Sequence, residues 1–351
     1  MIDAFAIVKI LILSTAAFLL TMAWTPAFTH FLYKYKLGKT IRDGKLTPIF
    51  SRLHAKKSGT PVMGGVLVWG TTFGMALLLG LAWSLWPESF FGQLSFLTRE
   101  QTLLPLGALV ASALVGLVDD YLNVKKIGPS GGGLKIRHRL LIYTVIAIVG
   151  AWWFYTKLDW DLLHVPFIGD FNIGLWYIPF FILVIVGTSF SVNQTDGLDG
   201  LAGGSLLMSF AAFSVISLLQ GRVDLAAFCA VIAGALLAFL WFNINPARFF
   251  MGDTGSMSLG VTLGIVAMLT NAALYLPIIG IVFVIEALST IVQMLSKKFR
   301  NKKVFLSAPI HHHLEAKGWP EPKIVMRFWV ISMVAAGLGV ALVVLDKLVT
   351  L

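Results

Sequence analysis

The sequence predicts an all-α, polytopic integral membrane protein of about ten transmembrane helices. Two features of composition and one of patterning predict this class. Of the 351 residues, 58% are hydrophobic and 13% are charged, about half the charged fraction of soluble domains, and the mean hydropathy is +0.85. The hydrophobic residues gather in runs long enough to cross a bilayer, which takes roughly 20 residues per helix. The composition therefore excludes a soluble globular domain.

The apolar runs define ten expected spans that are separated by short polar joints. These spans lie at 10–31, 62–83, 102–119, 139–155, 174–192, 200–219, 225–241, 255–270, 275–295 and 325–346. The first run is too long for a signal-peptide core, so we expect it to be retained as a span. The single cysteine, Cys229, lies inside an apolar run, which excludes a disulfide framework. We expect residues 1–351 to form a single transmembrane helical domain.

The positive charges are divided unequally between the two sides of the membrane. Of the 27 Lys and Arg residues, 22 fall in loops on one side and 5 on the other. Cytoplasmic loops carry the excess of positive charge, so the richer side is expected to be cytoplasmic and both termini to lie outside. The net charge of +10 originates in these loops, and nucleic-acid binding is therefore not expected.

The acidic residues and histidines that are candidates for a site lie at the ends of apolar runs on the expected cytoplasmic side. The loops of this side are 32–61, 120–138, 193–199, 242–254 and 296–324. Ionisable groups at membrane depth are costly unless they line a polar cavity or bind an ion. We therefore expect these loops to form an active-site face that handles a charged, metal-bound substrate.

A pair of carboxylates, Asp119 and Asp120, ends the third run. Adjacent side chains on a helix point about 100° apart, so both can border one cavity while only one faces a given ion. We expect one of them to ligate or orient phosphate and the other to act as a base. A solvated pair at a helix end is the alternative interpretation.

Asn193, Asp196 and Asp199 lie in a glycine-rich segment that leads into the sixth run. Residues three apart share a face of a helix, and the glycines permit close approach of the backbone to a ligand. Capping of the following helix is the competing explanation. Two acids together with an asparagine exceed what a cap needs, so the segment is a candidate binding site.

Asp253 precedes a Thr-Gly-Ser turn that opens the eighth run. A carboxylate in this position suits Mg²⁺, and the following backbone amides suit phosphate oxygens. The preceding Phe249 and Phe250 offer a ring on which a nucleobase can stack. For such a pair at a membrane border, an interfacial anchor is the alternative.

Three consecutive histidines, His311, His312 and His313, stand in the basic loop before the last run. A closed zinc site is not expected, because adjacent side chains diverge and no cysteine assists them. Hydrogen bonding to a pyrophosphate or a sugar suits them better. Lys57, in the first basic loop, would add a charge-assisted contact to a polyanion.

Five strings in register resemble the bacterial phospho-N-acetylmuramoyl-pentapeptide transferases, and the resemblance covers nearly the whole chain. The strings are 57–65 (KSGTPVMGG), 118–120 (VDD), 195–200 (TDGLDG), 250–253 (FMGD) and 309–313 (PIHHH). The resemblance implies a ten-span homodimer in the bacterial cytoplasmic (inner) membrane, with its site at the cytoplasmic face and nucleoside antibiotics as inhibitors. It also implies that undecaprenyl phosphate attacks the sugar-linked phosphate of UDP-N-acetylmuramoyl-pentapeptide, giving lipid I and UMP with Mg²⁺ required.

The resemblance also assigns expected roles to residues. Asp253 is the expected principal Mg²⁺ ligand, with Asp119 and Asp120 as further ligands at the phosphates, and His311 is expected to be catalytic. Asp199 is expected near uracil and Phe250 to stack on it. The residues expected to border the nucleotide are Lys57, Asn193, Asp196, Gly197, Leu198, Asp199, Asn243, Phe250, Gln293, His312 and His313. One departure from the family pattern is Arg139, where lysine is usual.

Two other functions remain open from the sequence. One is transfer of N-acetylglucosamine phosphate from its UDP donor to polyprenyl phosphate, by a sibling branch of the superfamily. The other is a cation-coupled transporter, because buried acids also form proton relays. Transporter sites tend to lie near the bilayer midplane within repeated halves, whereas here the acids gather at one face and only Glu286 lies mid-run. For the transferase we favour a single displacement, because a phosphate monoester titrates near pH 6 and is already ionised at neutral pH.

Overall fold

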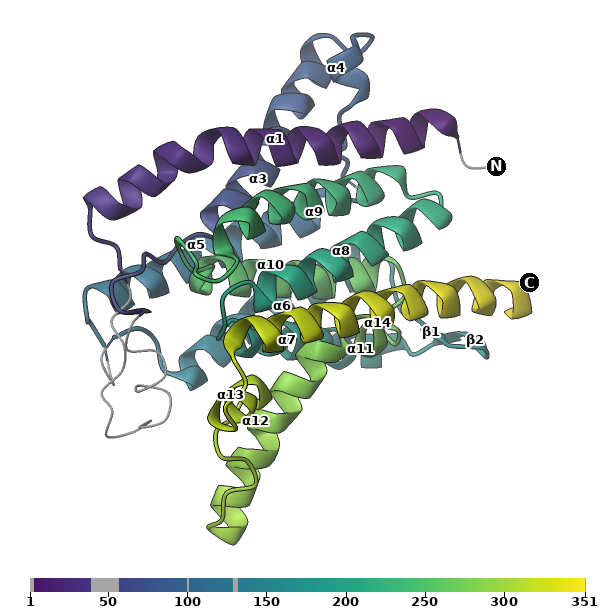
Figure 1. Cartoon of the computed structure of the whole chain (residues 1–351). Helices are drawn as coiled ribbons and strands as arrows, with labels where there is room; N and C mark the ends of the chain where they lie inside the picture. The colour runs from purple at the N-terminus through teal and green to yellow at the C-terminus, as the bar shows by residue number, and fades with distance from the viewer. Residues whose placement is uncertain (1–2, 39–56, 100, 129–131, 351) are drawn as a thin grey trace.

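The computed structural model describes residues 3–38, 57–99, 101–128 and 132–350, and these form an almost entirely helical bundle (Figure 1). Nine helices within the described residues are long and apolar enough to cross a membrane. The predicted class, an all-α polytopic membrane protein, is therefore confirmed. Parts of the predicted loops 32–61 and 120–138 lie outside the described residues.

Each predicted span corresponds to a helix. The elements are α1 (Ala4–Lys34), α3 (Val66–Leu85), α4 (Phe90–Gln93), α5 (Leu103–Val124), α6 (Ile136–Lys157), β1 (Leu162–Val165), β2 (Gly169–Asn172), the 3₁₀ helix η3 (Gly174–Trp176), α7 (Tyr177–Thr195), α8 (Leu201–Leu219), α9 (Val223–Asn243), α10 (Gly252–Leu269), α11 (Leu276–Ile279), α12 (Ile281–Arg300), α13 (Ile310–Ala316) and α14 (Glu321–Thr350).

Helix α10 is the centre of the bundle, and nearly all of its residues are buried. It packs against α5, α7, α3 and α8. Glycines allow these helices to approach closely: a Cβ placed on Gly65 would lie 2.3 Å from the Cα of Gly255. Close backbone contact is a main source of helix association in lipid, where burial of apolar surface between helices gives little. The start of α10 is thereby fixed relative to its neighbours.

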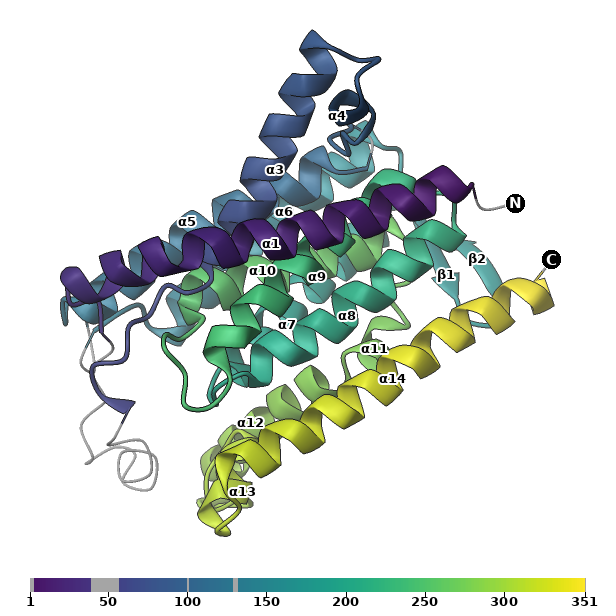
Figure 2. The same ribbon diagram turned by 45° about the horizontal axis from the view of Figure 1, so that its top comes forward.

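The ninth predicted span, 275–295, is interrupted. It begins as the short helix α11, breaks at Gly280 and continues as α12 to Arg300. Helix α12 is not one of the nine apolar helices, because it carries Glu286 and three basic residues in its last turn. It runs obliquely away from the main bundle (Figures 1 and 2) while packing against α7 and α14.

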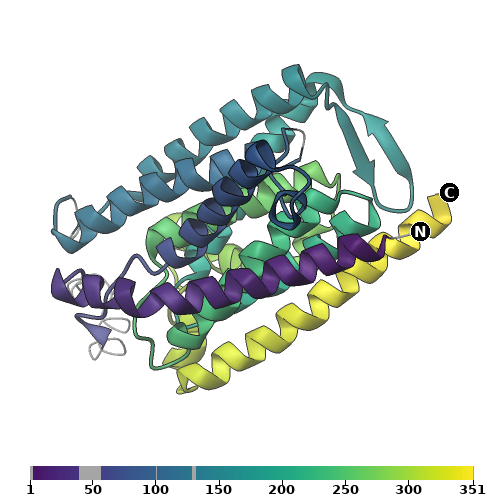
Figure 3. The ribbon, with the colours of Figure 1, turned by 90° about the horizontal axis from the view of Figure 1, so that it is seen from above.

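Both chain termini lie at one end of the bundle, together with the β1–β2 hairpin (Figure 3). The end of α5, the beginning of α6 and helix α13 lie at the opposite end (Figure 1). Because the long helices alternate in direction, the start of α10 and the end of α7 share this second end. The predicted acids therefore gather at a single end of the molecule.

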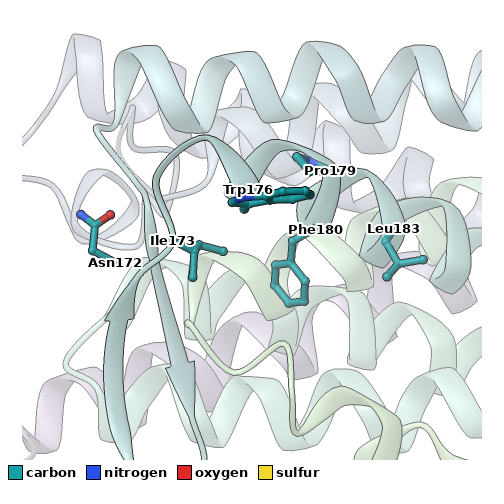
Figure 4. Close-up of a pocket in the computed structure, with 6 residues that line it drawn as sticks. All are labelled: Asn172, Ile173, Trp176, Pro179, Phe180 and Leu183. Atoms are coloured by element: carbon teal, nitrogen blue, oxygen red, sulfur yellow. The ribbon is translucent and has the colours of Figure 1, made fainter.

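A shallow apolar pocket of about 530 Å³ lies at the hairpin end of α7. Trp176, Phe180 and Ile173 line it, with Asn172 at its edge (Figure 4). None of the candidate site residues lines this pocket, and its nearest lining residue on α7, Leu183, lies about 15 Å along the helix from Asn193. Amphipathic tryptophans are typical of the membrane–water interface, so the pocket needs no ligand to explain its composition.

His164 fastens the hairpin to the end of α14. Its Nδ1 lies 2.8 Å from Asp170 Oδ1, and its Nε2 contacts the buried carboxylate of Asp346. Asp346 also accepts hydrogen bonds from the Tyr275 hydroxyl at 2.6 Å and from the Phe167 N–H at 2.8 Å. Burial alone would lower the pKa of His164, but the hydrogen bonds and charges of Asp346 and Asp170 raise it above its ordinary value.

This arrangement predicts a pH-dependent attachment of the hairpin. A raised folded-state pKa means that the stabilising contribution of His164 is complete below its unfolded pKa of about 6.5 and is lost as the pH rises through the folded value. We expect the wild-type protein to melt at a higher temperature than His164→Gln. This difference should be largest at pH 6 and should shrink progressively toward alkaline pH. The exposed His30→Gln on α1 is the control; an equal difference at every pH would contradict the prediction.

Candidate active site

Four polar side chains from α5, α6, α7 and α10 meet at the end of the bundle opposite the termini. Arg139 Nη2 lies 2.7 Å from Asp119 Oδ2 and 2.8 Å from Asp253 Oδ2. Arg139 Nη1 donates to Asp253 Oδ1 at 3.0 Å and to Asn193 Oδ1 at 3.2 Å. Asn193 Nδ2 donates to Asp253 Oδ1 at 2.6 Å. We call this network of Asp119, Arg139, Asn193 and Asp253 the carboxylate clamp.

Asp119 is the most enclosed member of the carboxylate clamp, with no exposed surface. Its Oδ1 accepts the N–H of Leu134 at 2.6 Å. Its Oδ2 touches the guanidinium but accepts no hydrogen bond of suitable geometry. A buried carboxylate oxygen without an aligned donor is costly, and such an oxygen is a suitable ligand for a hard cation.

Asp120 has different partners from Asp119. Its two carboxylate oxygens accept the backbone N–H groups of Asp253 at 2.9 Å and Thr254 at 3.0 Å. A carboxylate at this position satisfies unpaired amides of the first turn of α10 and interacts favourably with the helix dipole. Gly252 has φ +76°, and a Cβ there would lie 2.5 Å from Asp120 Oδ2. Asp120 therefore fixes the position of Asp253.

Gly116 brings α5 and α10 into contact beside the clamp. A Cβ at Gly116 would lie 2.4 Å from the backbone oxygen of Asp253, so Gly116→Ala must push the two helices apart. A displacement of about 1 Å can cost roughly 10²-fold in rate, and we expect a loss of that order in turnover from a protein that still folds. Gly107→Ala on the same helix is the matched control, because its Cβ meets nothing within 4 Å. Equal activity of the two variants would contradict the prediction.

A second network lies between the first loop and the beginning of α14. Lys57 Nζ is 2.6 Å from Asp199 Oδ1 and 2.5 Å from Glu321 Oε1. Asn245 Nδ2 donates to the other oxygens of both carboxylates, at 2.9 Å and 3.1 Å. The Asp199 N–H also donates to Glu321 Oε1 at 2.7 Å. We call Lys57, Asp199, Asn245 and Glu321 the Lys57 cluster.

Phe250 borders the Lys57 cluster, with its ring centroid 5.8 Å from Lys57 Nζ. Phe249, in contrast, is fully buried against Phe239 and Phe242. Of the two phenylalanines, the half-buried Phe250 is therefore the one whose ring can meet a ligand.

Asn243 connects two loops. Its Oδ1 accepts the N–H of Gly200 at 2.9 Å, and its Nδ2 donates to the carbonyl of Phe249 at 2.8 Å. Asn243 thus holds the turn before α8 against the loop that leads to α10.

His311 and Glu286 form a fully buried pair, with His311 Nδ1 2.8 Å from Glu286 Oε2. The adjacent His312 pairs differently, through Nδ1 with Glu315 Oε2 at 2.7 Å. The two rings nevertheless remain in edge-to-face contact, with their centroids 4.0 Å apart, so the predicted divergence of the adjacent imidazoles is wrong for this pair. Within the described residues no group of three or more His, Cys, Asp or Glu side chains is arranged to hold a metal by itself.

His313 and Gln293 order the loop after α12. The Leu306 N–H donates to His313 Nδ1 at 3.2 Å. Burial and the nearby Lys317 lower the pKa of His313 below its ordinary value, which agrees with an unprotonated Nδ1. Gln293 accepts the N–H groups of Val304 and Phe305 at 2.9 Å and 3.0 Å. The two side chains therefore shape the loop that carries the histidines to the site end.

Comparison with known proteins identifies the family of this chain. The profile of Glycosyl transferase family 4 matches residues 102–271. The phospho-N-acetylmuramoyl-pentapeptide-transferase of Chloroflexus aggregans is 40% identical over 347 residues, covering 95% of this chain and 89% of the relative. The chain belongs to the phospho-N-acetylmuramoyl-pentapeptide-transferase family. Proteins of the same name from Desulforapulum autotrophicum and Geobacillus thermodenitrificans are each 38% identical, covering 91% and 94% of this chain and 88% and 97% of the relatives.

Membership of this transferase family removes the transporter alternative. It leaves the individual residue assignments to be judged by the geometry. Asp119, Asn193 and Asp253 meet directly in the carboxylate clamp, and Lys57, Asp199 and Phe250 meet at the Lys57 cluster. Leu198 instead packs in a core cluster with Val282 and Phe328. Asp196 is the C-cap residue of α7, and Gly197 lies against the His311 ring.

Four residues of these networks were not among the predicted site residues. Arg139 stood out in the sequence only as a departure from the family pattern, and Glu286 only as an acid within a run. Glu321 and Asn245 lie within two of the predicted active-site loops, but no sequence feature marked either of them as a site residue. All four are recognisable only through partners more than 20 residues away in the chain.

Proposed function

We propose that this member of the family transfers phospho-N-acetylmuramoyl-pentapeptide from its UDP-linked donor to undecaprenyl phosphate, giving lipid I and UMP. The reaction takes place at the end of the bundle that holds the carboxylate clamp. The oxygen of the lipid phosphate forms the new bond to the sugar-linked phosphorus, and the bond from that phosphorus to UMP breaks. The names of the relatives and the gathering of acids at one end support this proposal.

The observation that carries the proposal is the placement of two carboxylates around one cation. Asp119 Oδ2 and Asp253 Oδ2 both contact Arg139 Nη2, so the site is already built to bind positive charge. Mg²⁺ is usually held by one or two carboxylates together with substrate phosphates. Asp119 Oδ2, which accepts no aligned hydrogen bond, and the neighbouring Asp253 fit this donor set, and we assign Mg²⁺ to these two residues. When bound there, the ion would neutralise the charge of the diphosphate and stabilise the charge that develops on UMP.

The side chains around the clamp supply positioning. Asp120 fixes the start of α10, and with it the carboxylate of Asp253. In this proposal it acts through that backbone contact, and not as the base or the metal ligand considered from the sequence. Phosphoryl transfer needs little more than alignment and electrostatic stabilisation. A lipid phosphate that is ionised at neutral pH is itself the nucleophile, so we retain a single displacement.

We assign the nucleotide to the surface between the clamp and the Lys57 cluster. Phe250 stacks on uracil, and Asp199 and Asn243 border it, while Lys57 contacts the donor. The cluster contains one ammonium and two carboxylates. An incoming diphosphate therefore competes with Asp199 and Glu321 for the Lys57 ammonium.

We propose that the site end faces the cytoplasm and that both termini lie outside, in the cytoplasmic (inner) membrane of a bacterium. The excess of Lys and Arg in the loops of the site end supports this orientation. A homodimer and inhibition by nucleoside antibiotics follow from the family resemblance. Size measurement in detergent and inhibition by a uridine-containing antibiotic test these two points.

The experiment that tests the activity is Mg²⁺-dependent UMP release by the purified protein with undecaprenyl phosphate. UDP-N-acetylmuramoyl-pentapeptide and UDP-N-acetylglucosamine are compared as donors. We expect release from the muramoyl donor alone. Release from the acetylglucosamine donor alone would assign the chain to the sibling chemistry, and failure with both donors in a folded protein would contradict the proposal.

A further inference from the structure

Glu286 is a buried acid that the proposed chemistry leaves without a task. It lies on α12 with no exposed surface, and its Oε2 is 2.8 Å from His311 Nδ1. Its other oxygen, Oε1, has no hydrogen-bond partner, and neither does His311 Nε2. Buried polar atoms almost always have partners, so two orphaned atoms on one pair of side chains require an explanation.

The pairing defines which nitrogen of His311 is free. An ionised carboxylate only accepts hydrogen bonds, so His311 Nδ1 carries the hydrogen and Nε2 is the remaining nitrogen. A carboxylate in this position also orients the ring and stabilises the imidazolium, as in other histidine–carboxylate pairs. When the ring binds a second hydrogen beside an anionic ligand, its Nε2–H is a charge-assisted donor suited to a phosphate oxygen.

His311 Nε2 is directed at the turn that joins the two networks of the site. A Cβ placed on Gly197 would lie 2.2 Å from this nitrogen, so only glycine permits the contact. The same turn runs from Asn193 of the carboxylate clamp to Asp199 of the Lys57 cluster. The free nitrogen therefore lies behind the segment that connects the metal side of the site to its nucleotide side.

We propose that Glu286 is a positioning residue that holds His311 with Nε2 directed at the turn of residues 195–200, where the diphosphate of the donor becomes its hydrogen-bond partner. This inference rests on the proposed function. The donor displaces the backbone of Gly197 from the ring, and Nε2 then gains its missing partner. No proton need be transferred, because UMP leaves with the bonding electron pair as a stable anion.

A double-mutant cycle tests the dependence of Glu286 on His311. We expect His311→Ala to lower kcat by about 10²-fold, as for loss of one hydrogen-bond donor to the charge of the transition state. Glu286→Gln should lower kcat by about tenfold or more, as for residues that orient a functional histidine. KM should change less than about threefold in both variants. The double variant should be no slower than His311→Ala. Losses that multiply in the double variant, or a rise in KM with kcat unchanged, would show a structural role and overturn the proposal.

Gly197 supplies a second test that does not disturb Glu286. The methyl group of Gly197→Ala must displace the imidazole ring, so kcat should fall in the wild-type background but not further in the His311→Ala background. Gly187→Ala on α7 is the control, because its Cβ meets nothing within 4 Å. A full loss in both backgrounds would overturn the proposal.

A spectroscopic measurement separates this inference from the proposed activity. The ¹⁵N resonances of His311, identified by their loss in His311→Ala, should report a hydrogen on Nδ1 in the wild type and change in Glu286→Gln. Titration with UDP should shift the Nε2 resonance. These signals require no turnover. An inactive protein with the expected signals would therefore contradict the proposed reaction but not the role of His311. An active protein whose Nε2 resonance is unmoved by UDP would contradict the role of His311.

Discussion

Asp253→Asn is expected to lower Mg²⁺-dependent UMP release by about 10³-fold, at the upper end of the range for loss of one electrostatic contact to the transition state. Asparagine has the shape of aspartate but no charge. It therefore retains an acceptor for Arg139 and Asn193 while losing the electrostatic attraction for a divalent ion. The measurement is UMP release over a range of Mg²⁺ concentrations.

The exposed Asp159→Asn near the hairpin end is the control for Asp253→Asn. It removes the same charge at the opposite end of the bundle and should leave turnover unchanged. Turnover of Asp253→Asn within a few-fold of wild type at saturating Mg²⁺ would refute the assignment of Asp253 as the principal ligand.

Arg139→Met is expected to have the largest effect on stability. Removal of one partner from a buried ion pair leaves an uncompensated charge and costs about 3–5 kcal/mol. Arg139 is the cation that contacts both Asp119 and Asp253, so its loss leaves these two carboxylates close together without a counter-charge. The measurement is thermal unfolding in detergent with and without Mg²⁺. Mg²⁺ should raise the melting temperature of Arg139→Met more than that of wild type, because the ion replaces the missing charge.

Two variants serve as controls for Arg139→Met. Arg139→Lys keeps the charge but not the planar fork of two donors, so it should be closer to wild type in stability. Arg137→Met changes an exposed residue of the same helix and should have little effect. Equal responses of Arg139→Met and wild type to Mg²⁺ would show that the ion does not bind between the two carboxylates.

The sequence predicts the helices well, because each span is defined by local composition. The ten apolar runs correspond to helices, and only the run at 275–295 is interrupted, at Gly280. A glycine within an apolar run is compatible with continuation or with a break, and packing of α11 against α14 decides the outcome. The predicted site residues also gather at one end, because the sequence places all of them in or next to loops on the same side of the membrane.

Individual partners could not be predicted in the same way. Asp119 and Asp120 are adjacent in sequence, yet the first joins the carboxylate clamp and the second caps α10. Their difference depends on how α5 crosses α10, which is determined by the contact at Gly116. Glu286 likewise finds His311 through the oblique course of α12. Such pairings arise from tertiary packing, and a single sequence has no periodicity that reports them.

The carboxylate clamp limits how this part of the protein can evolve. It takes one residue from each of four helices, and every member is a hydrogen-bond or ionic partner of at least one other. A mutation that removes charge or hydrogen-bonding capacity from one member leaves a neighbour unpaired inside the bundle. Viable variation is thus confined to exchanges that keep the charge, such as arginine for lysine, or to coordinated changes at two positions. An inhibitor whose affinity depended on these four side chains would leave few single-step routes to resistance.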